Sequence, residues 1–162
     1  MPIRAGVLTI SDKASRGERA DTSGAAIVEL LSTIDVAVQR SQVVPDEAGQ
    51  ISATLRSWAD SDELDVIITT GGTGLGPRDV TPEATAEVIE RPVPGLGEAM
   101  RAAGLKHTPM AALSRGIAGV RGRCLIVNLP GSPKGVRESL TVLLPILPHA
   151  LQLLRGESSE HR

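Results

Sequence analysis

Two aspartates follow stretches that the residue pattern predicts to be strands of one β-sheet. Asp46 comes after the β-rich run Val36–Val44, and Asp79 lies in a glycine-rich segment after DVIITT (65–70). Because ligands of open α/β sheets bind beyond the carboxyl ends of the strands, we expect both carboxylates at that edge. Magnesium takes oxygen ligands and is often shared between protein carboxylates and substrate phosphates. The spacing therefore makes Asp46 and Asp79 candidate metal-binding residues of a phosphate site.

Each aspartate also has a plainer interpretation. Asp46 stands between Pro45 and an expected helix, where an aspartate commonly caps the helix N-terminus. Asp79 suits an Asx-type turn or an ion pair with its neighbour Arg78. The sequence alone leaves these structural roles open beside the chemical one.

The segment TTGGTGLGPRDVTPEAT (69–85) indicates a cradle for an anion. It holds Gly71, Gly72, Gly74 and Gly76, and so many glycines cost more chain entropy than a simple turn requires. Glycines let the backbone approach an anion closely and point its N–H groups at it. The spacing matches neither GxxxxGK nor GxGxxG, so the pattern does not name the ligand.

Two helix starts reinforce the expectation of an anion site. Thr81-Pro82 and Ser132-Pro133 each place a capping residue before a proline that fits the first helical position. The unpaired N–H groups of a helix N-terminus favour phosphate. Basic residues near the expected strand ends could oppose phosphate charge, although each one alone is more often a solvated surface charge: Lys13, Arg16, Arg78 and Lys134.

The elements that position these residues alternate between strand and helix, which predicts an α/β fold. We expect three layers, with a mostly parallel sheet and helices on both faces. The expected strands are 4–10, 36–44, 65–70 and a hairpin formed by 116–121 and 123–129. The expected helices follow a polar loop after the first strand, begin at Pro45-Asp46-Glu47, run from Thr81 to Ile89, cover Glu98–Ala103, and end with one helix carrying Val136 to Leu147.

Composition excludes several other classes of protein. The 162 residues predict one domain (1–155) followed by a polar, disordered tail (156–162). A net charge of -2 and 1% aromatic residues argue against nucleic-acid binding. Cys124 is the only cysteine, so no disulfide forms within a chain, and we interpret it as a buried hydrophobe. No signal or membrane-spanning segment is expected, which predicts a cytoplasmic protein.

Four segments in order resemble the MoaB/Mog family of molybdenum-cofactor proteins: LTISDKASRGERADTSG, VVPDE, TTGGTGLGPRDVTPEAT and LPGSPKGVRE. The resemblance covers about Ile3 to Leu154. It implies a MoaB/Mog-like fold, a homotrimer, and adenylylation of molybdopterin by magnesium-ATP with release of pyrophosphate. It also implies a possible hand-over of the product to a metal-insertion protein. The substrates would be molybdopterin and ATP, with no other organic cofactor.

The resemblance assigns roles to individual residues. It implies that Asp46 and Asp79 are the catalytic, metal-associated pair. The other implied substrate- and nucleotide-binding residues lie in three loops: Ser11 and Asp12; Gly71, Gly72, Thr73 and Gly74; and Pro130, Gly131, Ser132 and Pro133.

Two rival functions remain at this point. The first is a homologue that binds molybdopterin without catalysis; the intact aspartate pair argues against it without deciding the matter. The second is a nucleotide-dependent oxidoreductase, which the missing GxGxxG motif disfavours.

Overall fold

One mixed sheet runs through the protein, described by a computed structural model for residues 2–157. Its strand order is β2-β1-β3-β6-β5-β4. The strands β2, β1, β3 and β6 are parallel, whereas β5 pairs antiparallel with both β6 and β4. Their bounds are β1 Ile3–Ile10, β2 Val36–Val44, β3 Val66–Thr70, β4 Arg91–Pro92, β5 Ala118–Arg121 and β6 Cys124–Leu129. The expected hairpin is confirmed as β5 and β6.

Burial follows each strand's place in the sheet. The central strands β3 and β6 are buried at every residue, as expected of parallel strands covered on both faces. At the sheet edge, β2 alternates in its first half, with Val36 and Val38 partly buried between exposed neighbours. The alternation that predicted a half-exposed strand is therefore confirmed for that half.

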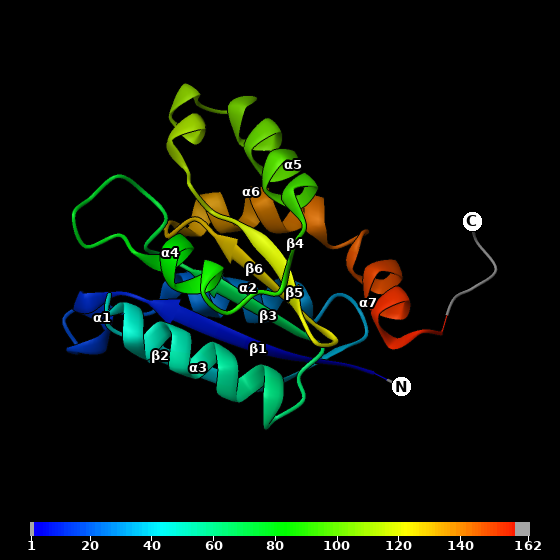
Figure 1. The fold of residues 1–162 in the computed structure, drawn as a ribbon. Coiled ribbons are helices and arrows are strands. Elements are labelled where there is room, and N and C mark those ends of the chain that lie inside the picture. The colour runs from blue at the N-terminus through cyan, green and yellow to red at the C-terminus, as the bar shows by residue number, and fades with distance from the viewer. Residues whose placement is uncertain (1, 158–162) are drawn as a thin grey trace.

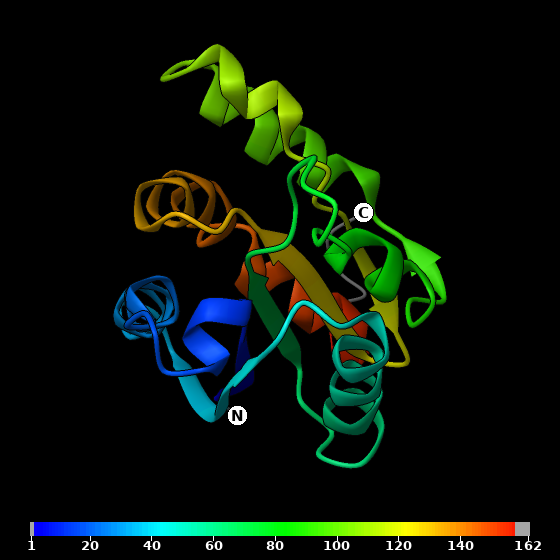
Figure 2. The same ribbon diagram turned by 90° about the vertical axis from the view of Figure 1, so that its left-hand side faces the viewer.

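Helices cover both faces of the sheet (Figures 1 and 2), which confirms the predicted α/β class. On one face α2 and α6 pack with Ile27, Leu140 and Leu143 buried, and on the other α3 and α4 bury Leu55 and Ala84. The bounds are α1 Asp12–Ser15, α2 Thr22–Leu31, α3 Ala48–Asp60, α4 Thr81–Ala86, α5 Pro94–Leu105, the 3-10 helix η1 Pro109–Leu113, α6 Pro133–Leu143 and α7 Leu147–Arg155.

Several helix boundaries differ from those expected. The polar loop after β1 contains the short helix α1, and α4 ends at Ala86 rather than Ile89. Pro94 begins α5 instead of preceding it, because proline is tolerated in the first helical turn. The prediction of a single C-terminal helix is wrong, because α6 ends at Leu143 and α7 begins at Leu147. Pro145, which lacks an N–H, lies between the two helices.

The described part of the chain ends at residue 157, just after α7. Gly156 adopts the left-handed conformation, with φ of 73°, that commonly closes a helix. Most of the tail predicted at 156–162, namely 158–162, lies outside the described residues. Within 2–157, no helix has both the length and the apolar character needed to cross a membrane.

Candidate active site

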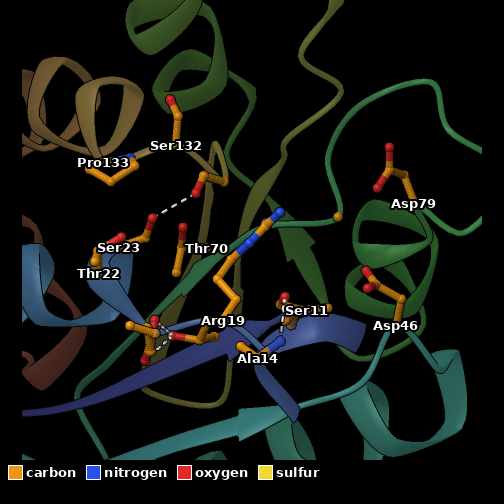
Figure 3. Close-up of a pocket in the computed structure, with 17 residues that line it drawn as sticks. Ser11, Ala14, Arg19, Thr22, Ser23, Asp46, Thr70, Asp79, Ser132 and Pro133 are labelled. Carbon is orange, nitrogen blue, oxygen red and sulfur yellow. Dashed lines mark hydrogen bonds between the residues drawn. The ribbon is translucent and has the colours of Figure 1, made fainter. Parts of the chain in front are cut away.

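A cavity of about 560 Å³ opens at the carboxyl ends of β1, β3 and β6 (Figure 3). Many of the predicted site residues line it: Ser11, Asp46, Gly71, Gly72, Asp79, Gly131, Ser132 and Pro133. Four others do not: Asp12 is hydrogen-bonded to Asp46, Thr73 and Gly74 lie farther along the glycine-rich loop, and Pro130 lines a neighbouring cavity. The topology therefore brings segments of four strand-to-helix loops to one place.

Asp46 is held by a reciprocal pair of hydrogen bonds with Asp12. The backbone N–H of Asp12 donates to Asp46 Oδ2 at 2.9 Å, and that of Asp46 donates to Asp12 Oδ1 at 3.0 Å. The structure thus gives Asp12 a supporting position rather than a place in the cavity lining. The N-cap of α3 is Glu47, so Asp46 is not the capping residue.

Arg78 secures this arrangement from the glycine-rich loop. Its guanidinium donates to both carboxylate oxygens of Asp12, at 3.0 Å each, and to Glu47 at 3.0 Å. Within the described chain its ion pairs are with Asp12 and Glu47, and the possible pair with Asp79 does not form. These hydrogen bonds hold the pKa of Asp12 below its ordinary value, so Asp12 stays ionised.

The two aspartates facing the cavity carry unbalanced negative charge. Burial raises the pKa of Asp46 above its ordinary value, and the like charges of Asp12 and Asp79 raise it further. Asp79 Oδ2 accepts the Gly76 N–H at 2.9 Å, so the turn-forming role exists alongside its place in the cavity. A bound cation would relieve the repulsion between Asp46 and Asp79.

Magnesium fits this donor set. The ion prefers oxygen ligands and usually combines one or two carboxylates with substrate phosphates. Asp46 and Asp79 supply such carboxylates in a cavity that also exposes backbone of the glycine loop. In residues 2–157 no cluster of three or more His, Cys, Asp or Glu side chains is placed to hold a metal ion. The remaining ligands would therefore have to come from substrate oxygens and water.

The first two glycines of the loop are required by close packing as well as by conformation. Gly71 has φ of 98°, and a Cβ there would lie 2.2 Å from the carbonyl oxygen of Ile10. Gly72 has φ of 69°, and its Cβ would meet Thr81 Oγ1 at 2.2 Å and Asp46 Oδ1 at 3.2 Å. Positive φ at these positions favours glycine. The glycines thus let the loop backbone pass between β1 and α4 beside Asp46.

The two predicted helix caps have different outcomes. Ser132 caps α6, because its hydroxyl accepts the Gly135 N–H at 3.0 Å. The prediction for Thr81 is wrong: Val80 occupies the N-cap, and Thr81 is the first helical residue. The Thr81 hydroxyl instead donates to the Gly71 carbonyl at 2.9 Å, where it fixes the glycine loop.

Sequence reasoning missed several lining residues: Thr9, Arg19, Asp21, Ser23 and Thr70. Ser23 Oγ donates to the Gly131 carbonyl and Thr70 Oγ1 to the Pro130 carbonyl, each at 2.6 Å. These bonds hold the segment before α6 against the end of the sheet. In the sequence, the polar residues Thr9 and Thr70 near the carboxyl ends of expected strands could have indicated that these positions line the site.

Arg115 is a further residue that the sequence did not indicate. It donates to the carbonyls of Gly74 and Asp79 at 2.8 Å each, and its two terminal nitrogens contact Glu83. Its own N–H also donates to the Thr73 carbonyl at 2.8 Å. Arg115 therefore fixes the loop that carries Asp79 from a segment distant in the chain.

Fold and cavity together define an α/β protein with a polar, glycine-lined cavity at the strand ends. Residues 6–149 match the model of the family described as "Probable molybdopterin binding domain". The chain belongs to this family, which confirms the predicted relationship.

Individual relatives agree with this assignment. The molybdopterin adenylyltransferase of Helicobacter pylori strain J99 is 44% identical over 156 residues, which cover 95% of this chain and 89% of the relative. That of Escherichia coli K12 is 38% identical, with coverage of 95% and 86%. The crystal structure of the molybdopterin biosynthesis enzyme MoaB from Thermus thermophilus has a TM-score of 0.91 at 59% identity, covering 98% and 99% of the chains. These likenesses confirm the MoaB/Mog-like fold.

Proposed function

We propose that this protein is a molybdopterin adenylyltransferase of molybdenum cofactor biosynthesis, using ATP as co-substrate. The main structural support for this proposal is that Asp46 and Asp79 line the same cavity as the glycine loop and the start of α6. Relatives that align with nearly the whole chain carry the name of this activity. The site thus combines a place for phosphates with carboxylates suited to magnesium.

In the proposed reaction, a terminal phosphate oxygen of molybdopterin attacks the α-phosphorus of ATP. A new phosphorus–oxygen bond forms as the bond from the α-phosphorus to the bridging oxygen breaks, and pyrophosphate leaves with that electron pair. Magnesium, held by Asp46 and Asp79, would neutralise phosphate charge. The backbone of the glycine loop would bind and orient the phosphates, so catalysis is positioning plus electrostatic stabilisation. No protein nucleophile takes part.

A neighbouring cavity of about 240 Å³ supplies room for the rest of a substrate. It shares Ser132 with the first cavity and is lined in part by Met100, Met110, Ala111 and Asn128. Apolar walls with a few convergent polar groups are typical of small-molecule sites. We assign the flat heterocycle of one substrate to this second cavity and the phosphates to the first.

The decisive test is transfer of AMP to molybdopterin by the variant Asp79→Ala. We expect a loss of roughly 100-fold or more in turnover, because the variant lacks one carboxylate of the metal site. Asp62→Ala is the matched control, since Asp62 pairs with Arg40 away from the cavity. Turnover of folded Asp79→Ala at the wild-type rate would contradict the role of the carboxylate. Binding of molybdopterin by the wild type without magnesium-dependent pyrophosphate release would favour the non-catalytic alternative.

The assembly and the cellular context are also proposals. The homotrimer is implied by the resemblance to the MoaB/Mog family, and exposed apolar side chains on α5 and η1 offer a surface for contact between subunits, namely Leu105, Met110 and Leu113. Transfer of the product to a metal-insertion protein is supported by a relative named molybdenum cofactor biosynthesis bifunctional protein, from Synechococcus elongatus. It is 40% identical, and only 47% of its length aligns with this chain. We place the protein in the cytoplasm.

A further inference from the structure

The active-site cavity is lined by more negative than positive side chains. Asp21, Asp46 and Asp79 contribute carboxylates, and Arg19 is the only basic residue in the described lining. Asp21 is already engaged, because it accepts hydrogen bonds from Thr9 and from the backbone of α2. The proposed magnesium ion would offset the charge of Asp46 and Asp79, so among the side chains of the described lining a polyphosphate finds only Arg19 as a positively charged partner.

The other arginines around the site are committed to protein partners. Arg78 is bound by Asp12 and Glu47, and Arg115 is bound by Glu83 and by loop carbonyls. Arg16, on the same loop as Arg19, pairs with Glu18 at 2.9 Å and does not line the cavity. Their charges are largely offset within the protein.

Arg19 differs from all three. Among the hydrogen bonds and ion pairs of the described residues, it takes part in none, and it is exposed at the cavity wall. Figure 3 shows its side chain extended into the cavity, with Ser23 and Thr70 on one side in this view and Asp46 and Asp79 on the other. Its loop is defined on both sides, by Gly17 with φ of 73° and by Asp21 at the start of α2. The backbone on both sides thus places Arg19 at the cavity wall, and its guanidinium donates to no group of the described residues.

We propose that Arg19 is a substrate-binding residue whose guanidinium binds a phosphate group of one of the two substrates. This assignment rests on the proposed function, in which a triphosphate and a monophosphate meet in this cavity. Arginine presents parallel N–H donors that match two phosphate oxygens. On the nucleotide, Arg19 would hold the phosphates that leave as pyrophosphate; on molybdopterin, it would orient the attacking phosphate.

The test compares Arg19→Ala and Arg19→Lys with Arg16→Ala, a control that removes a neighbouring exposed charge from the same loop. Calorimetric titration with inorganic pyrophosphate and magnesium reports binding without turnover. Steady-state assays give KM separately for ATP and for molybdopterin. We expect Arg19→Ala to weaken the interaction with one of the two substrates about tenfold. Arg19→Lys should weaken it less, because lysine keeps the positive charge but lacks the parallel N–H donors of the guanidinium. Arg16→Ala should stay within about twofold of wild type.

The pattern of results identifies the phosphate. Weaker pyrophosphate binding with a raised KM for ATP places Arg19 on the nucleotide, whereas a raised KM for molybdopterin alone places it on the acceptor. The proposal is overturned if Arg19→Ala matches Arg16→Ala in all three measurements. A wild-type protein that binds pyrophosphate but transfers no AMP would instead refute the proposed function. In that case, equal pyrophosphate affinities of Arg19→Ala and Arg16→Ala would overturn the assignment of Arg19 as well, whereas weaker binding by Arg19→Ala alone would support it.

Discussion

At the scale of single residues, Asp46 is held in surroundings that are unfavourable for a carboxylate in the absence of a bound cation. It is partly buried and lies close to the carboxylates of Asp12 and Asp79. These surroundings disfavour its ionised form. The backbone N–H of Asp12 nevertheless holds it at the cavity, and the missing Cβ of Gly72 leaves room for it, an arrangement that fits the proposed role in binding a cation.

We therefore predict that Asp46→Asn is more stable than wild type at neutral pH and has lost activity by roughly 100-fold or more. Because folding raises the pKa of Asp46, the folded state binds more protons than the unfolded state. Wild-type stability thus falls as the pH rises through that raised pKa. Asparagine keeps an oxygen to accept the Asp12 N–H and removes this penalty. Thermal unfolding between about pH 4 and 8 measures the effect.

Asp62→Asn is the control, for which we expect the opposite change in stability. Its hydrogen bonds from Arg40 lower the pKa of Asp62, so the variant should lose a little stability at neutral pH and keep its activity. A neutral-pH melting temperature for Asp46→Asn below that of wild type would contradict this account of Asp46.

At the scale of elements, the loop from β3 to α4 is shaped by residues outside it. Arg115 follows η1 and binds the loop at Gly74 and Asp79, while Arg78 ties it to Asp12 at the start of α1. A glycine-rich segment has high conformational freedom. These two arginines restrict that freedom and so define where Asp79 stands.

We predict that Arg115→Lys lowers turnover by roughly tenfold, because lysine cannot serve the two loop carbonyls and Glu83 together. Amide hydrogen exchange in 73–80 should quicken, since the loop opens more often. Arg121→Lys is the control. Arg121 likewise donates two hydrogen bonds to a carboxylate, that of Asp60, and one to the Val88 carbonyl, but it does not line the cavity. Unchanged exchange in 73–80 with reduced turnover would show that Arg115 acts other than by holding the loop.

At the scale of the whole molecule, local patterns predicted five of the six strands, all except the edge strand β4, and the loops that meet in the cavity. Buried strands and their polar carboxyl ends are visible in short windows, and Asp46, Asp79 and Ser132 followed from them. The contacts of Arg115 could not be predicted, because its partners lie far away in sequence, as with the separation of 41 residues from Gly74. Thr81 has the sequence signal of a cap, yet tertiary packing directs its hydroxyl to Gly71.

The end of the sheet remote from the cavity carries a separate polar cluster that joins both ends of the described chain. Asp65 is 7% exposed and accepts hydrogen bonds from the Arg4 N–H at 2.8 Å and from Arg155 Nη2 at 2.7 Å. Burial alone would raise the pKa of Asp65, but these bonds outweigh it and the pKa is lowered. The cluster thus connects β1 to α7 at the end of the sheet opposite the active-site cavity.

We predict that Asp65→Asn lowers the free energy of unfolding by about 1–3 kcal/mol at neutral pH and leaves kcat/KM at 25 °C unchanged. Because folding lowers the pKa of Asp65, its stabilisation is full above the pKa of an unfolded aspartate and is lost as the pH falls through the folded value. The deficit of the variant should therefore shrink in acid, opposite to the behaviour of Asp46→Asn. Combining the two substitutions should give additive shifts, since the sites share no partner. Urea unfolding of the single and double variants tests this, and a loss of activity in folded Asp65→Asn would mean that the two ends of the sheet are coupled.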